Sequence, residues 1–130
     1  MKVTGLDHVQ IVMPPGREQD ARRFYAVLLG MTEVRKPDTL APRGGCWFEA
    51  RGTVVHVGVE EPFVAACKAH PAFRVGDLEQ CRKELEKAGI LIAADETLPD
   101  VRRVYAADPF GNRIEFIQDG DGFAQRSPYY

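Results

Sequence analysis

The sequence predicts the same order of elements twice, and this repetition is the feature that most limits its fold. Each half reads as a strand, an amphipathic helix and three short strands. In the first half these segments are residues 6–15, 16–30, 31–35, 45–50 and 53–60. In the second half they are residues 68–75, 76–89, 90–94, 101–107 and 112–118. The chain therefore consists of two βαβββ modules in tandem.

Both helices carry clear local signals. The first has apolar residues at i, i+3, i+4 and i+7, namely Ala21, Phe24, Tyr25 and Leu28. In the second, Asp77 and Gln80 have the spacing of a capping box. Gly30 and Gly89 end the two helices, as glycine often does at this position.

The spacing of four polar residues supports a true repeat. His8 and His56 are 48 positions apart, whereas His70 and Glu115 are 45 positions apart. The distance from His8 to Gly30 is also three positions longer than the distance from His70 to Gly89. A single three-residue insertion in the first half explains both differences. In this register His8 is equivalent to His70, and His56 is equivalent to Glu115.

Glu115 is the least expected of these residues. It lies between Ile114 and Phe116 in a predicted strand, after the turn sequence DPFGN. A carboxylate near a core requires a partner, because an unpaired buried charge is very costly. Its partner could be an arginine, with Arg103 and Arg113 as candidates, another hydrogen-bond donor or a metal ion.

A divalent metal ion would use all four polar residues together. We expect His8, His56, His70 and Glu115 on the inner faces of their strands. Imidazole and carboxylate groups are natural ligands of such ions, and two histidines with one carboxylate leave positions open for a substrate. Taken singly, each histidine is more often a hydrogen-bonded structural residue. The joint placement favours the metal site.

Composition excludes several functional classes. The net charge is −2, with 28% charged residues and no basic run, so we expect neither nucleic-acid nor membrane binding. The three cysteines lack CxxC spacing and read as small hydrophobic residues. We expect a cytoplasmic chain with one domain over residues 1–130. Within it, module one covers about 1–62, module two about 66–119, and residues 120–130 form a tail.

The segments GLDHVQIVMP, HPAFRVGDLE and YAADPFGNRIEFIQ resemble the vicinal oxygen chelate superfamily. This superfamily includes glyoxalase I, fosfomycin-resistance transferases, extradiol dioxygenases and bleomycin-resistance proteins. The resemblance covers nearly the whole chain and implies an α+β fold. In that fold, two βαβββ modules form curved mixed sheets around a metal cup, with the helices outside.

The resemblance also implies a ligand set. His8, His70 and Glu115 match the metal-binding positions of the superfamily, so it implies one divalent ion per chain, either Zn, Mn, Ni or Fe. His56 lies where glyoxalase I carries a metal-binding glutamate, which speaks against glyoxalase I activity. As a neutral imidazole, His56 could be a fourth ligand or a base. We favour the ligand role, because the position of His56 repeats that of Glu115 in the other module. His56 and Glu115 are thus the catalytic candidates.

Strand register adds three candidates for substrate binding, Gln10, Trp47 and Tyr105. By resemblance to the fosfomycin enzymes, positions like these line the substrate cavity. Each could equally be a core residue.

These observations predict a metal-dependent, glyoxalase-like enzyme acting on a small molecule that chelates the ion through adjacent oxygens, with isomerase, lyase or transferase chemistry. One alternative is a non-haem iron dioxygenase, which a set of two histidines and one carboxylate permits. Another is a metal-free resistance protein that binds a drug or metabolite. We also expect a homodimer, because short modules leave exposed sheet edges that a second chain can cover.

Overall fold

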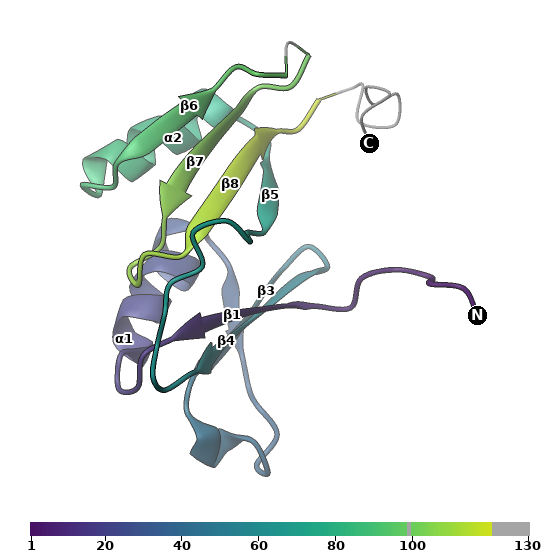
Figure 1. Cartoon of the computed structure of the whole chain (residues 1–130), viewed down its shortest axis with the longest axis vertical. Coiled ribbons are helices and arrows are strands. Elements are labelled where there is room, and N and C mark those ends of the chain that lie inside the picture. Colours follow the sequence, from purple (N-terminus) through teal and green to yellow (C-terminus); the bar gives the residue numbers. More distant parts are fainter. Residues whose placement is uncertain (99, 121–130) are drawn as a thin grey trace. The chain divides into compact units, whose positions relative to one another are not determined.

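The computed structural model describes residues 1–98 and 100–120. These residues form two four-stranded mixed sheets, one in each half of the chain (Figure 1). The chain divides into two compact units. Unit 1 contains Met1–Ala65 and Pro109–Asn112, and unit 2 contains Ala66–Asp108 and, within the described chain, residues 113–120.

Unit 1 has one mixed sheet with the strand order β1-β4-β3-β2. Strand β1 pairs in parallel with β4, and the other two pairings are antiparallel. Its elements are β1 (Val9–Met13), α1 (Glu18–Ala21), η1 (Arg22–Leu28), β2 (Thr32–Val34), η2 (Ala41–Arg43), β3 (Cys46–Ala50) and β4 (Thr53–Val59). One face of this sheet packs on the helix, and there Tyr25 stacks on Phe48 with ring centroids 5.4 Å apart. Both rings are fully buried, so they form the centre of this core.

The first helix differs from the sequence-based expectation. Its α-helical part is only Glu18–Ala21, and Arg22–Leu28 is a π-helix. In a π-helix the hydrogen bonds span five residues, as in the bond from the Leu29 amide to the Phe24 carbonyl (2.9 Å). Three of the four predicted apolar residues, Ala21, Phe24 and Tyr25, are nevertheless buried, whereas Leu28 is half-buried. An apolar spacing of three and four residues identifies the buried face but does not distinguish these two helix types.

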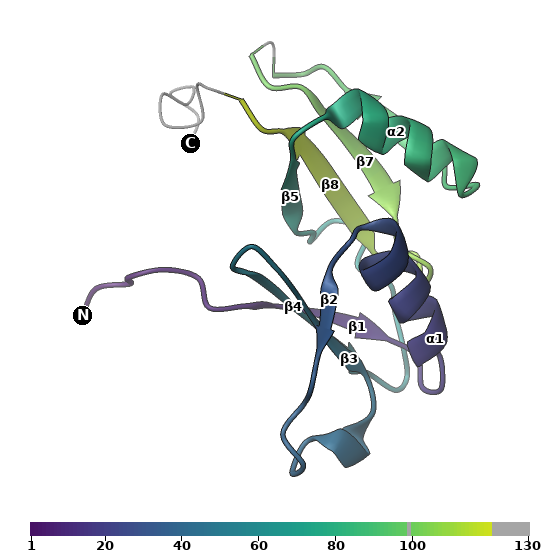
Figure 2. The same cartoon turned by 180° about the vertical axis from the view of Figure 1, so that it is seen from behind.

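Unit 2 repeats this topology with the strand order β5-β8-β7-β6, and β5 is parallel to β8. Its elements are β5 (Ala72–Val75), α2 (Leu78–Lys87), β6 (Ile92–Asp95), β7 (Arg103–Ala107) and β8 (Arg113–Gln118). The Asp77 side chain accepts a hydrogen bond from the Gln80 amide (2.9 Å), which confirms the predicted helix start. Helix α2 lies across one face of its sheet (Figure 2).

The two sheets confirm the predicted α+β fold of two βαβββ modules, because the four strands of each unit are arranged in the same order in their sheet. The DPFGN turn adds a detail that the repeat did not suggest. Its residues Pro109–Asn112 belong to unit 1, where Asn112 Nδ2 donates to the Val12 carbonyl (2.7 Å). The Arg17 guanidinium lies 5.1 Å from the Phe110 ring in the same unit.

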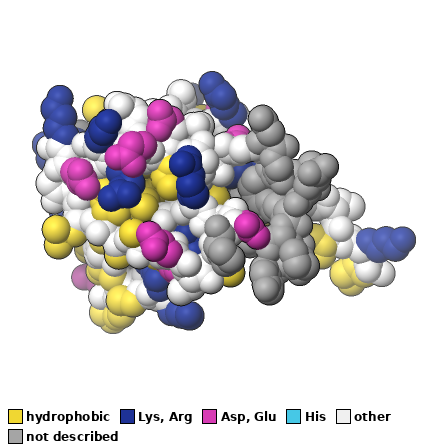
Figure 3. Space-filling view, turned by 90° about the horizontal axis from the view of Figure 1, so that it is seen from above, with side chains coloured by type: hydrophobic (Ala, Val, Ile, Leu, Met, Phe, Trp, Pro, Cys, Tyr) yellow, Lys and Arg dark blue, Asp and Glu magenta, His cyan; other side chains and the backbone are white. Residues whose placement is uncertain are grey.

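The surface seen in Figure 3 carries acidic and basic side chains intermixed, without a large area of one sign. Within residues 1–98 and 100–120, no helix is both long and apolar enough to cross a lipid bilayer. The predicted tail lies outside the described residues, except for Gly120.

Candidate metal and substrate site

The sheet of unit 1 places three predicted site residues in one row. Gln10 of β1 and Trp47 of β3 are both register partners of His56 in β4. Directly paired residues point to the same side of a sheet. The core residues Phe48, Val55 and Val57 alternate with them and point to the helix side. Gln10, Trp47 and His56 therefore share the face that the helix does not cover.

His56 lies between two other rings. The indole of Trp47 stacks on it at a centroid distance of 3.8 Å and an angle of 3°, and the His8 ring stacks at 4.1 Å and 20°. An imidazole has only two faces, so these near-parallel rings lie on opposite sides. Burial lowers the pKa of His56, and the nearby His8 lowers it further. The stack thus favours a neutral imidazole at this position.

His8 immediately precedes β1 and is exposed. Its Nδ1 atom donates to the carboxylate of Asp7 (2.7 Å). Metal-binding histidines commonly donate one ring nitrogen to an oxygen acceptor, which fixes the tautomer and leaves the other nitrogen for the ion. This contact leaves Nε2 as the His8 atom that could bind an ion.

Gln10 lies across Gly58 of β4. The Gln10 amide occupies the space that a Cβ atom on residue 58 would take. Gln10 Nε2 donates to the carbonyl of Ile11 (3.3 Å), and Gln10 lies on the same side of the sheet as His56.

Glu115 is the central residue of the corresponding face of unit 2. It is the register partner of both Ala72 in β5 and Tyr105 in β7, and only 4% of the residue is exposed. Its Oε2 atom lies 2.9 Å from Nε2 of His70. The Nδ1 atom of His70 donates to the Lys68 carbonyl (2.8 Å). His70 thus repeats the arrangement of His8, with Nδ1 bonded to an oxygen and Nε2 available to a partner.

Arg103 is the second partner of Glu115. Its guanidinium donates to Glu115 Oε1 (3.2 Å) and to Asp95 Oδ2 (2.9 Å). Burial lowers the pKa of Arg103, but Tyr105 and the two carboxylates outweigh burial and raise it above its ordinary value. Of the arginines considered from sequence, Arg103 and not Arg113 contacts Glu115. The register between β7 and β8 brings Arg103 to Glu115, and this register could not be assigned from the sequence.

Tyr105 lies beside both groups. Its ring meets the His70 ring edge-on at 5.3 Å, and the Arg113 guanidinium lies 3.9 Å from its centroid. Burial raises the pKa of the Tyr105 phenol, and the Glu115 carboxylate raises it further. The phenol is therefore protonated at neutral pH and can donate a hydrogen bond.

The donor atoms of unit 2 fit a divalent ion. Two ligands bound side by side to one zinc ion lie about 2.9 Å apart in an octahedral shell and about 3.4 Å apart in a tetrahedral one, given metal–ligand distances of about 2.0–2.1 Å. The 2.9 Å between His70 Nε2 and Glu115 Oε2 is a hydrogen-bond distance that equals the octahedral spacing and is shorter than the tetrahedral one. In unit 1, the near-parallel rings of His8 and His56 do not direct their nitrogens toward one point.

The predicted ligands are divided equally between the units. Unit 1 contains His8 and His56, and unit 2 contains His70 and Glu115. Among the described residues, no cluster of three or more histidine, cysteine, aspartate or glutamate side chains is suited to a metal ion. Each unit by itself thus provides two donors, and the complete ligand set remains a prediction.

Two βαβββ modules, with polar residues on the open face of each sheet, define the class of proteins to which this fold belongs. The sequence model of the "Glyoxalase/Bleomycin resistance protein/Dioxygenase superfamily" matches residues 5–116. The chain belongs to this superfamily. A comparison with curated proteins finds no significant match.

Solved structures give the same result. A glyoxalase family protein from Bacillus anthracis is 47% identical, with a TM-score of 0.87 over 92% of this chain and 98% of the other. A glyoxalase/dioxygenase from Nostoc punctiforme is 24% identical, with a TM-score of 0.71 over 90% and 92% of the two chains. The fosfomycin resistance protein FosX from Listeria monocytogenes is 13% identical, with a TM-score of 0.69 over 92% and 94%. The last two likenesses concern the fold alone.

Proposed function

We propose that the protein is a metal-dependent, glyoxalase-like enzyme that acts on a small molecule with adjacent oxygen atoms. The observation that carries this proposal is the contact between His70 and Glu115. A buried carboxylate, placed at 2.9 Å from an imidazole nitrogen whose ring is fixed from its other side, is prepared to bind a cation. Membership of a superfamily that contains glyoxalases and dioxygenases supports an enzymatic role.

The proposed ligands are His8, His70 and Glu115, with one divalent ion per chain. His8 and His70 support this assignment because each donates Nδ1 to an oxygen, which leaves Nε2 as the atom for the ion. In His70 this atom lies 2.9 Å from Oε2 of Glu115, the other proposed ligand of unit 2. When bound, such an ion polarises the substrate oxygens and stabilises negative charge that develops on them. We also propose a homodimer, because a second chain can cover the exposed sheet edges.

The remaining residues have roles that follow from their contacts. His56 is a neutral imidazole and can accept a proton from the substrate. Trp47 offers an apolar ring surface beside it, and the protonated phenol of Tyr105 can donate to a substrate oxygen. The stack with His8 favours the base role of His56 over the ligand role. A cobalt(II) spectrum that is unchanged in His56→Ala would exclude the ligand role.

One observation also favours the dioxygenase alternative. If His56 stays in its stack, the ligands are two histidines and one carboxylate, a set that non-haem iron enzymes use with positions open for oxygen. Oxygen consumption by the iron-loaded protein with catechol as substrate would identify this chemistry. Turnover without oxygen uptake would support the isomerase, lyase or transferase type.

The chelating role can be tested before a substrate is known. Manganese-loaded protein should enhance water-proton relaxation, and oxalate should reduce this enhancement by replacing water on the ion. His70→Ala should show neither effect at the same concentrations. Oxalate binding of equal strength in metal-free and manganese-loaded protein would contradict the proposal and favour a metal-free binding protein.

A further inference from the structure

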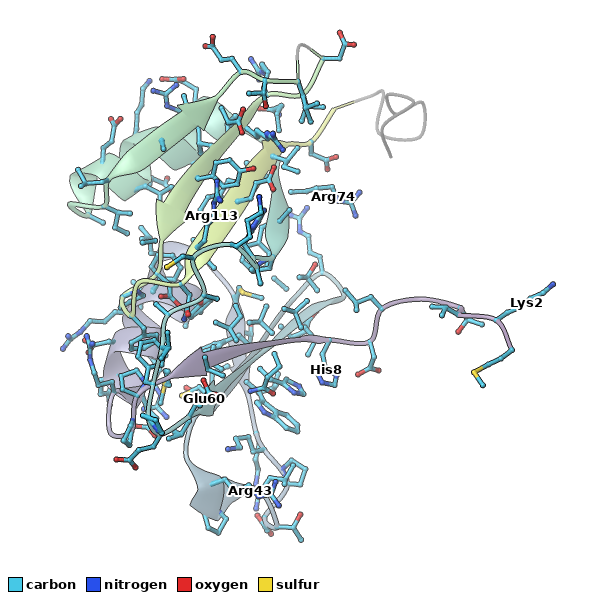
Figure 4. The ribbon with its side chains drawn as sticks, viewed as in Figure 1. Lys2, His8, Arg43, Glu60, Arg74 and Arg113 are labelled. Atoms are coloured by element: carbon cyan, nitrogen blue, oxygen red, sulfur yellow. The ribbon has the colours of Figure 1, made fainter. Side chains whose placement is uncertain are left out.

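Arg113 occupies a distinctive place on the open face of unit 2. It begins β8 and lies two residues before Glu115, so both side chains point to the same side of the sheet. Figure 4 labels it on this strand. Its guanidinium lies 3.9 Å from the centroid of the Tyr105 ring, and the residue is half-buried.

The charge of Arg113 is not neutralised as that of Arg103 is. Arg103 on the same face forms ion pairs with both Asp95 and Glu115. Among residues 1–98 and 100–120, none of the ion pairs involves Arg113. A half-buried cation of this kind retains its attraction for an anion, because no carboxylate of the described chain forms an ion pair with it.

The contact with Tyr105 explains how the guanidinium is held. Stacking on an aromatic ring uses the flat face of the group and leaves the N–H donors along its edge available. These donors match the two oxygens of a carboxylate, or two oxygens of a phosphate or phosphonate. A guanidinium held over the Tyr105 ring in this way can bind an anion through two hydrogen bonds.

We propose that Arg113 is a substrate-binding residue that recognises an oxyanion group, either a carboxylate or a phosphate-type group, on a small substrate. This inference rests on the proposed function, since it assigns the substrate of that site to the anionic class. Two residues along a strand span about 6.6 Å. A small anion held by Arg113 therefore has its other end within reach of the Glu115 carboxylate.

The test uses nitrogen-15 NMR of the Arg113 Nε–H group in the metal-free full-length protein. Oxalate and inorganic phosphate are titrated separately. We expect a saturable shift of this signal, and roughly tenfold weaker binding in Arg113→Ala, measured by calorimetry, because a charge-assisted pair of hydrogen bonds is lost. Saturation by oxalate alone assigns a carboxylate, and saturation by phosphate alone assigns a phosphate-type group.

Two variants serve as controls. Arg113→Lys keeps the charge but not the paired donors, so it should bind with intermediate affinity and guards against a folding defect in Arg113→Ala. Lys83→Ala removes the same charge from an exposed position on α2, on the other side of the sheet, and should bind as the wild type does. Equal affinity of Arg113→Ala and wild type, or no saturable shift with either anion, would overturn the inference.

Zinc binding, measured on the same samples, separates this inference from the proposed function. A wild type that binds zinc, with anion affinity unaffected by Arg113→Ala, would refute only the role of Arg113. A wild type that binds the anion through Arg113 but binds none of zinc, manganese, nickel and ferrous ions would refute the metal-dependent function and leave the anion site standing.

Discussion

The Nε2 atom of His70 lies 2.9 Å from the Oε2 atom of Glu115. Because Nδ1 of His70 faces a carbonyl oxygen, which can only accept, Nδ1 carries a hydrogen. At 2.9 Å, the contact with Glu115 is a hydrogen bond, with one hydrogen between its two atoms. A divalent cation bound by both atoms takes the place of that hydrogen.

The first prediction concerns the support of Glu115 by Arg103. Both side chains are largely buried, with 13% of the Arg103 side chain and 6% of the Glu115 side chain exposed. Arg103→Ala should lower the free energy of unfolding by about 3 kcal/mol, because it leaves a buried carboxylate without its cation. Denaturant unfolding in the presence of a chelator measures this value.

An exposed ion pair provides the control for that experiment. Arg35 and Asp38 are joined at 2.6 Å, but their side chains are 83% and 85% exposed. Arg35→Ala should therefore cost less than about 1 kcal/mol. In the background of Arg103→Ala, Glu115→Gln should restore part of the lost stability. If the two arginine variants lose equal stability, Arg103 does not support a buried charge.

The second prediction uses Trp47, the single tryptophan of the chain, as a reporter of His56. Protonation of an imidazole stacked at 3.8 Å should quench the indole fluorescence. The midpoint in metal-free protein should lie below 6.5, since burial and the nearby His8 lower the pKa of His56. His56→Ala should abolish this transition, whereas a midpoint above 6.5 would show that the imidazole is not desolvated.

The same shift predicts how stability depends on pH. The unfolded chain binds a proton at His56 more readily than the folded chain, because the folded pKa is the lower one. The contribution of neutral His56 to the free energy of unfolding is therefore complete above pH 6.5. It is lost as the pH falls through the pKa of His56 in the folded protein. His56→Ala should remove this part of the pH dependence in thermal unfolding.

The third prediction concerns the three cysteines. Cys67 is exposed, whereas burial raises the pKa of both Cys46 and Cys81 to about 11. At pH 8 only about one in a thousand of these two thiols is ionised, and the thiolate is the reactive form. In the folded protein, a thiol reagent should modify Cys67 first. After unfolding, it should modify all three cysteines. Rapid modification of Cys46 in the folded protein would contradict its burial.

The fourth prediction is the homodimer. Strands β1 and β5 each pair on one side only within their sheets, so an unpaired edge is available in each unit of the described chain. Light scattering at micromolar concentration should give twice the mass of the 14.5 kDa chain. A monomer that still binds one metal ion would reject this proposal.

Most of the fold could be predicted because its signals are local. The Asp77 cap and the alternation around Glu115 each depend on a few neighbouring residues, and the repeat is visible in the shared spacing of His8 and His70. The need of Glu115 for a partner was also visible in the sequence. Which partner it has was not, because the contact with Arg103 depends on the register between β7 and β8.

Other features depend on packing that leaves no pattern in the sequence. The π-helical turn at Arg22–Leu28 has the same apolar spacing as an α-helix. The stack of His56 between Trp47 and His8 requires side-chain orientations that strand alternation does not specify. The place of residues 109–112 in unit 1 likewise follows from long-range contacts, such as that from Asn112 to Val12.

Zinc binding by the wild type and by Glu115→Gln tests the central claim most directly. Glu115→Gln keeps the shape of the side chain but removes the negative charge that the ion requires. The wild type should bind about one ion per chain in elemental analysis, and the variant should bind more than about a hundredfold more weakly in calorimetry. A wild type that stays metal-free after reconstitution with zinc, manganese, nickel and ferrous ions, or a variant of unchanged affinity, would contradict the account.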